Sequence, residues 1–182
     1  MKTVVAALAF LTIAPACALA QGAKLQIDHL NRLAERAEES VTVDVTPDML
    51  KLFQSFAPAN DPKAAAAREL LSGLKGIYVR SFEFGNGKGY TPDDVATIRK
   101  QLEAPGWARM VNVHKPKAGE VVDVYFYQEA GKVAGLAVLV AEPAELTVVN
   151  IVGPIDLSKL PALGGQFGIP NLPPVDTAGA KK

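Results

Sequence analysis

The second half of the chain consists of four strand-like runs with short polar connections between them. β-branched and aromatic residues dominate these runs, which are Arg109–His114, Val121–Gln128, Lys132–Ala141 and Glu145–Gly153. The connections have between three and six residues. That length suits hairpins but is too short for the helical crossover that parallel neighbours need. The sequence therefore predicts a four-strand antiparallel meander.

The first half alternates helical and strand patterns. Helices are predicted from apolar spacing, N-terminal caps and terminating glycine or proline at Ile27–Ala37, Thr46–Ala57, Lys63–Leu74 and Thr91–Leu102. Strands are predicted at Val41–Val45 and Ile77–Phe84, and a fifth helix at Asp156–Leu163. The expected fold is α+β: a mainly antiparallel sheet with a four-strand C-terminal meander, covered by four to five helices.

The first twenty residues have the three regions of a secretory signal peptide. Lys2 precedes an apolar run from Val4 to Ile13, and Ala18 and Ala20 supply the small residues of a cleavage site. We expect residues 1–20 to be a signal peptide, 21–170 a single α+β domain, and 171–182 a flexible Pro/Gly/Lys tail. Cys17 leaves a lipoprotein signal as an alternative, although Ala14-Pro15-Ala16 lacks the large aliphatic residue that such a signal has.

Composition excludes several classes of function. The chain has 19 basic and 19 acidic side chains, so it has no cationic excess with which to bind nucleic acid. No run outside the leader approaches a membrane span, since Val133–Ala141 has nine residues with Gly135 among them. Cleavage after Ala20 would leave a chain without cysteine, which excludes disulfides and thiolate chemistry. We expect an exported protein, periplasmic or secreted, that binds no cofactor.

The hairpins predict which side chains share a face of the sheet. A turn at Ala130-Gly131 pairs Glu129 with Lys132, and the preceding loop pairs His114 with Val121 and Asn112 with Asp123. This register gives one core face formed by Val111, Val113, Val122, Val124, Phe126, Val133, Gly135, Ala137 and Leu139. The other face carries a polar half and an apolar half: Asn112, His114, Asp123, Tyr125 and Tyr127, then Leu136, Val138, Val140, Val149 and Ile151.

The apolar residues on this second predicted face have two interpretations. Helices or the Pro-rich tail cover it, or it is an exposed patch that binds a partner. In the second case Tyr125, Leu136 and Val149 are the candidate binding residues.

Catalytic candidates are few. His114, near Asn112 and Asp123, could form a His-carboxylate pair for general base chemistry, but the neighbouring Tyr125 would need a strongly lowered pKa to act as a nucleophile. The two histidines, His29 and His114, lack metal-ligand spacing, so no metal site is expected. Arg80 lies on the same side of its strand as Tyr78 and Phe82, which predicts a buried ion pair or stacking on an aromatic ring.

Three stretches resemble a known family. They are Ile77-Tyr78-Val79-Arg80-Ser81-Phe82-Glu83-Phe84, Pro105-Gly106-Trp107, and the run from Glu145 through Gly153-Pro154-Ile155-Asp156-Leu157 to Leu163-Gly164-Gly165-Gln166-Phe167-Gly168-Ile169-Pro170. Together they are similar to the family called domain of unknown function 4252. The resemblance implies an exported bacterial protein and transfers no catalytic residue.

The leading functional hypothesis is a non-catalytic binding or interaction module in the bacterial envelope. Its expected partner is an envelope protein or a small apolar ligand. Two alternatives remain: a small envelope hydrolase using His114 and Asp123, and a carrier of amphiphiles with a pocket between sheet and helices.

Overall fold

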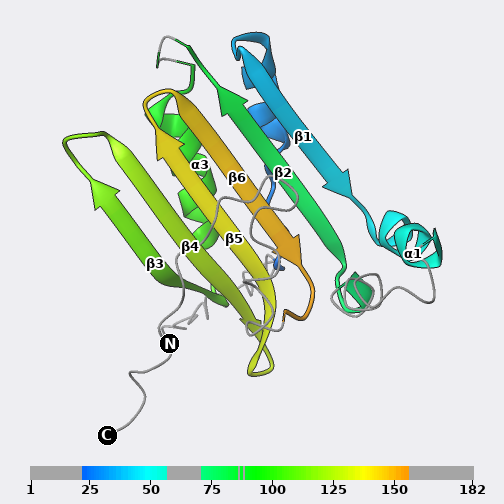
Figure 1. Cartoon of the computed structure of the whole chain (residues 1–182). Helices are drawn as coiled ribbons and strands as arrows, with labels where there is room; N and C mark the ends of the chain where they lie inside the picture. Colours follow the sequence, from blue (N-terminus) through cyan, green and yellow to red (C-terminus); the bar gives the residue numbers. More distant parts are fainter. Residues whose placement is uncertain (1–21, 57–70, 86, 88, 156–182) are drawn as a thin grey trace, which may run out of the picture.

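The computed structural model describes residues 22–56, 71–85, 87 and 89–155. They form one six-stranded sheet in the order β1-β2-β6-β5-β4-β3, in which every neighbouring pair is antiparallel (Figure 1). The strands are β1 (Glu39–Val45), β2 (Gly76–Glu83), β3 (Trp107–Lys115), β4 (Glu120–Glu129), β5 (Lys132–Glu142) and β6 (Glu145–Val152). The helices in this part of the chain are η1 (Asp28–Glu35), α1 (Pro47–Phe56) and α3 (Pro92–Leu102).

The path of the chain explains this strand order. β1 and β2 lie side by side, and α3 then carries the chain to the far edge, where β3 begins. From β3 the meander returns strand by strand until β6 pairs with β2. The predicted α+β class with a mainly antiparallel sheet is confirmed, and β3, β4, β5 and β6 are neighbours in chain order. Of the four to five helices expected, the described residues include η1, α1 and α3. The arrangement leaves β1 and β3 as the two outer strands of the sheet.

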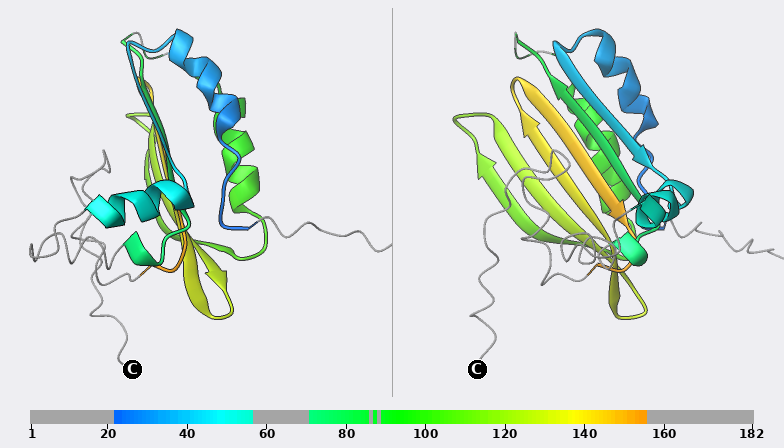
Figure 2. Two further views of the ribbon diagram at one scale, coloured as in Figure 1. Left: turned by 90° about the vertical axis from the view of Figure 1, so that its right-hand side faces the viewer. Right: turned by 45° about the vertical axis from the view of Figure 1, so that its right-hand side comes forward.

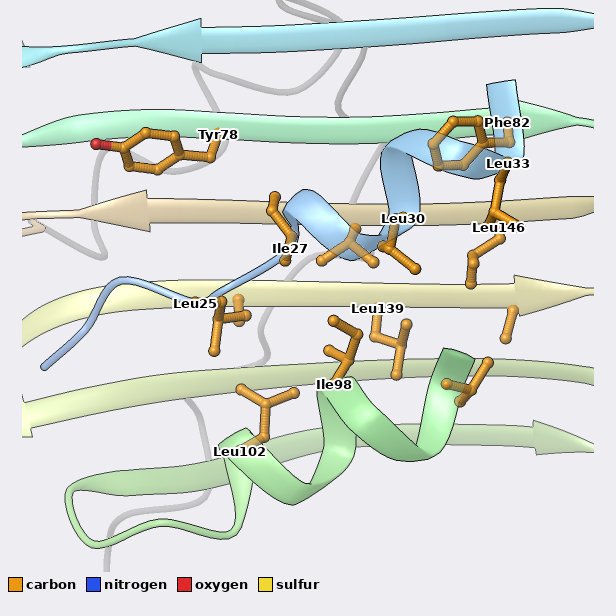
Figure 3. Close-up of a cluster of buried hydrophobic side chains, with 14 of the residues drawn as sticks. Leu25, Ile27, Leu30, Leu33, Tyr78, Phe82, Ile98, Leu102, Leu139 and Leu146 are labelled. Carbon is orange, nitrogen blue, oxygen red and sulfur yellow. The ribbon is translucent and has the colours of Figure 1, made fainter. Parts of the chain in front are cut away.

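The first face of the sheet is the one covered by η1 and α3 (Figure 2). Figure 3 shows Leu30 and Leu33 from η1, and Ile98 and Leu102 from α3, packed over Leu139 and Leu146 of the sheet. All six side chains are buried. Burial of one large aliphatic side chain contributes roughly 1.5–3 kcal/mol, so this layer supplies a large share of the stability.

The second face, on the opposite side of the sheet, is also buried. Its cluster contains Val79 from β2, Val149 from β6 and Leu50 from α1. The other sheet members are Ile77, Val124, Phe126, Leu136, Val138, Val140 and Ile151. Both faces of the central strands are therefore apolar, which fits the long hydrophobic runs of β5 and β6.

The register prediction is half right. Glu129 pairs with Lys132, His114 with Val121 and Asn112 with Asp123, as expected. Beyond the hairpin tip, however, Tyr127 pairs with Gly135 and Gln128 with Val133, so Ala134 is an extra residue in β5. This β-bulge moves every later side chain of β5 to the other face.

The predicted split of side chains between the faces is therefore wrong for β5. Val124 and Phe126 lie opposite Val138 and Leu136 on the second face. Asp123, Tyr125 and Tyr127 share the first face with Gly135, Ala137 and Leu139. The polar side chains that were expected beside Leu136 and Val149 thus lie on the opposite side of the sheet.

Most of the predicted helices and strands in the described residues are confirmed. The opening helix is a 3₁₀-helix, η1, and α3 ends at Leu102 as expected. Asp94 accepts hydrogen bonds from the Thr91 N–H and hydroxyl, both at 2.8 Å, which fixes the start of α3. The helix expected at Lys63–Leu74 lies largely outside the described residues, and the one expected at Asp156–Leu163 lies entirely outside them.

An extended N-terminal segment, Gly22–Ile27, crosses the first face before η1 begins. Ala23, Leu25 and Ile27 are buried there. Asn150 of β6 holds the segment: its Oδ1 accepts from the Leu25 N–H at 2.9 Å, and its Nδ2 donates to the Ala23 carbonyl at 2.9 Å. Gly135 makes room, because a Cβ at this position would lie 2.6 Å from the Ala23 Cβ.

Arg80 of β2 forms the expected buried ion pair. Its guanidinium donates twice to Asp44 of β1, at 3.0 Å each, and once to Asp28 of η1 at 3.2 Å. Nε donates to the Asn31 side chain at 2.6 Å. Arg80 is 1% exposed, whereas the side chains of Asp44 and Asp28 are 48% and 82% exposed. One buried cation therefore links β1, β2 and η1.

Candidate functional site

Asp123 of β4 is the most deeply buried carboxylate of the sheet, and it is held by basic and amide groups. Arg99 of α3 donates to its Oδ2 at 3.2 Å, and Asn112 of β3 donates to its Oδ1 at 2.6 Å. Arg109 of β3 lies 3.8 Å from Oδ1. Because Asp123 is fully buried, these contacts compensate its charge and fasten α3 to the β3–β4 hairpin.

His114 lies on the same side of β3 as Asn112, and its side chain is exposed. Among the described residues, the contacts of Asp123 are with Arg99, Arg109 and Asn112. A general base pair needs the carboxylate to orient the imidazole. In this structure the carboxylate instead orients two guanidinium groups and an amide.

Tyr125, which follows on the same face of β4, is buried. Burial raises the pKa of its hydroxyl, and the Asp123 carboxylate raises it further, against smaller lowering effects of Arg109 and Arg99. A nucleophilic tyrosine needs a lowered pKa. Tyr125 therefore stays protonated at neutral pH and is suited to packing and hydrogen bonding.

The two aliphatic candidates, Leu136 and Val149, lie in the interior of the second face. Leu136 is 2% exposed and Val149 0% exposed. Both side chains therefore lie in the interior, and neither belongs to the exposed apolar residues of the described chain.

The large apolar side chains that are exposed gather at the two edges of the sheet. At the β1 edge, Val41 lies on the strand and Met49, Leu52 and Phe53 lie on α1. At the β3 edge they are Met110 and Val113. These six are all the exposed large hydrophobic residues in the described part of the chain. We call the first four the β1-edge patch and the last two the β3-edge patch.

The β1-edge patch follows from the geometry of α1. This helix lies at the end of β1, on the side of the sheet away from η1 and α3 (Figures 1 and 2). Leu50 points into the core of the second face, while Leu52 and Phe53 are more than half exposed. The sequence contains the signal, since Met49-Leu50 and Leu52-Phe53 place more apolar residues on α1 than one buried stripe accommodates. The sequence-based candidates did not include it.

Three carboxylates, Glu120, Glu142 and Glu145, lie at one end of the second face, next to Lys115. Burial raises the pKa of Glu142, and the neighbouring Glu120 and Glu145 raise it further, against a smaller lowering effect of Lys115. In the described part of the chain, no group of three or more His, Cys, Asp or Glu side chains is placed to hold a metal ion.

Glu142→Gln should stabilise the protein at neutral pH. The folded-state pKa of Glu142 lies above its unfolded value, so the folded state loses stability as the pH rises through that interval. The amide removes the cost of ionisation, and the gain should shrink below about pH 4, where the carboxyl group is protonated in both states. Urea denaturation at both pH values measures the difference. Glu129→Gln, at the exposed hairpin tip, is the matched control; an equal gain there would contradict this explanation.

No helix among the described residues is both long and apolar enough to cross a membrane.

Neither the curated proteins nor the solved structures include a match to this chain. One family model matches residues 35–163, a range that runs from the end of η1 through the whole sheet. It is the model of a domain of unknown function, DUF4252. The chain therefore belongs to the DUF4252 family.

Proposed function

We propose that the chain is an exported protein of the bacterial envelope that acts as a non-catalytic interaction module. Its binding surface is the β1-edge patch together with the open edge of β1. The partner is a protein that adds an extended segment to this edge.

One observation carries the proposal: the exposed large apolar side chains of the described residues lie at the edges of the sheet. Single exposed apolar residues are common on protein surfaces, but several of them at a strand with one open edge are typical of an interaction site. Val41 is 41% exposed and Phe53 52% exposed. Both would lose contact with water when a partner binds.

An edge strand is a suitable receptor for an extended segment. In the described structure β1 pairs only with β2, so the backbone groups of its outer edge are available to a partner. Strand addition uses such groups for affinity and the alternating side chains for specificity. Val41, Val43 and Val45 of β1 form an apolar row on the second face, against which side chains of an added strand could pack.

The contacts of Asp123 favour this function over the hydrolase alternative. Arg99, Arg109 and Asn112 contact the Asp123 carboxylate, and burial raises the pKa of Tyr125. His114 is left exposed on β3 without that carboxylate as a partner in the described contacts.

Site-specific photocrosslinking in the envelope fraction tests the proposal. A photoreactive residue at Phe53 should form discrete protein adducts, because Phe53 lies in the proposed interface. The same residue at Lys100, which is exposed on α3, is the matched control and should give no such adducts. Adducts of equal yield at both positions, or none at Phe53, would contradict a binding surface at the β1 edge.

The export part of the proposal predicts a mature N-terminus at Gln21. Ala18 and Ala20 are the small residues that signal peptidase recognises. Mass spectrometry of the exported protein measures the start directly. A chain that begins at Cys17 with the added mass of a lipid would replace the periplasmic or secreted location with a lipid-anchored one.

A further inference from the structure

The two outer strands of the sheet carry charges of opposite sign. β1 has Glu39 and Asp44 and no basic residue. β3 has Arg109 and Lys115 and no acidic residue. Charges on edge strands commonly prevent edge-to-edge association. Within the chain, Asp44 binds Arg80, Arg109 lies 3.8 Å from Asp123, and Lys115 binds Glu120. The charge complementarity between the two edges therefore depends on Glu39 of β1 and Lys115 of β3.

The two edges also have compatible directions. Each of the five neighbouring pairs in the six-stranded sheet is antiparallel, so β1 and β3 run in opposite directions. A second copy in the same orientation therefore places its β3 antiparallel to β1 of the first. The first faces of both copies then lie on the same side of one continuous sheet.

One register matches side chains along this contact. When Val41 lies opposite Val113 of the second copy, Val43 lies opposite Val111, and Glu39 lies opposite Lys115. All six residues belong to the second-face side of their strands, as the pairings of β1 with β2 and of β3 with β4 show. Opposed valines and opposed opposite charges each stabilise an antiparallel pair. Lys115, whose side chain is 59% exposed, retains an N–H for Glu39 beside its two bonds to Glu120.

We propose that the protein segment that binds the β1 edge is β3 of a second copy of this chain, an inference that rests on the function proposed above. The β1-edge patch and the β3-edge patch are the two halves of one interface. In the antiparallel arrangement, the end of β1 that leads into α1 lies beside the start of β3. α1 follows that end of β1, so it would lie nearest to the start of β3, where Met110 is 50% exposed at the bulge.

This interface is heterologous, because different surfaces of the two copies meet. After one contact forms, one copy still has a free β1 edge and the other a free β3 edge. Such contacts build open chains unless a rotation closes a ring. Each added copy extends the sheet by six strands and buries the edges that are exposed in the single chain.

Cysteine pairs test this register in the purified exported protein. The exported protein that begins at Gln21 has no cysteine of its own, because the chain's only cysteine is Cys17 and lies before that start. A mixture of the Val41→Cys and Val113→Cys proteins, treated with a short thiol-to-thiol crosslinker, should give a dimer that contains one copy of each. The double variant should give a ladder of multimers, because each copy then has both reactive edges. A mixture of Val41→Cys and Lys100→Cys is the control and should remain uncrosslinked.

Val41→Lys tests the energetics of the contact. It places a charge where Val113 of the second copy would bury it, and its exposed position at the edge spares the core. By sedimentation velocity, the association constant should fall about tenfold or more, which corresponds to about 1.4 kcal/mol or more. Ala96→Lys, on the exposed side of α3, should leave the constant unchanged. Circular dichroism of each variant establishes that it is folded.

Three results would overturn the inference. The first is a protein that stays monomeric at every concentration. The second is a crosslink that joins two Val41→Cys copies in preference to the mixed pair. The third is an equal change of the association constant in Val41→Lys and Ala96→Lys. The function proposed above fails by a different result, the loss of Phe53 adducts in the envelope fraction. Adducts of Phe53 with other proteins, combined with a purified chain that stays single, would retain the binding edge and reject the second copy as its partner.

Discussion

Asp44→Ala is expected to lower the free energy of unfolding by about 3 kcal/mol, because the buried Arg80 guanidinium loses the nearer of its two carboxylate partners. Arg80 is 1% exposed, and its two shortest ionic contacts, at 3.0 Å, both go to Asp44. Without Asp44, the guanidinium keeps only the well-hydrated Asp28, Asn31 and backbone carbonyls as acceptors. Urea denaturation followed by circular dichroism measures the loss.

Removal of the cation instead of Asp44 should lower the free energy of unfolding by less. Arg80→Met removes the cation and leaves Asp44 and Asp28, whose side chains reach water. Adding Arg80→Met to Asp44→Ala should therefore recover part of the lost stability, since no charge then remains buried and unpaired. Asp48→Ala, at a carboxylate that is 91% exposed, should change stability by less than about 0.5 kcal/mol. If Arg80→Met proved the more damaging change, the role of Asp44 as the necessary counter-charge would be wrong.

Asn150→Asp is the second substitution with a large expected effect, a loss of about 3 kcal/mol. Nδ2 of Asn150 donates to the carbonyls of Ala23 and Leu136 at 2.9 and 3.2 Å. Aspartate places a second oxygen toward both carbonyls and buries a charge. Segment Gly22–Ile27 should then detach, which hydrogen exchange of the Leu25 amide would detect as lost protection.

Asn150→Ala separates the two components of that loss. It removes the hydrogen bonds without adding a charge, so it should destabilise the protein less than Asn150→Asp does. Leu25→Ala tests the segment without touching Asn150 and should cost about 2–5 kcal/mol, because Leu25 is buried. A segment that stays protected in Asn150→Asp would show that apolar packing alone holds it.

The sequence predicts the fold class because its local signals agree with one another. Valine alternation marks β1, the Thr91-Pro92-Asp93-Asp94 cap marks α3, and short connections mark the meander. The turn at Ala130-Gly131 is also readable, and both residues have the positive φ that a tight hairpin requires. Arg80 among apolar neighbours correctly predicted a buried ion pair.

The distribution of side chains between the faces of β5 could not be predicted. Val133 to Ala141 is apolar throughout, so no alternation reveals the extra residue at Ala134. A single bulge then exchanges the faces for the rest of the strand. That error placed Asp123 and Tyr125 beside Leu136 and Val149, which lie on the opposite face.

The candidate site was harder to predict from the sequence than the fold, for a related reason. Arg99 and Arg109 reach Asp123 from α3 and β3, and no local spacing in the sequence joins these elements. Likewise, the edge position of β1 depends on β6 pairing with β2, a contact between strands that lie far apart in the sequence. Val41 and Phe53 become a surface feature only once that topology is known.

Hydrogen exchange of the edge strands tests the binding-module account most directly. The protein is pulse-labelled in its envelope fraction and, in parallel, after purification and dilution. We expect the amides of β1 to be protected in the envelope fraction and to exchange faster in the dilute protein, while β5 and β6, in the middle of the sheet, remain protected in both. Equal exchange of the β1 amides under the two conditions would contradict a binding edge at this strand.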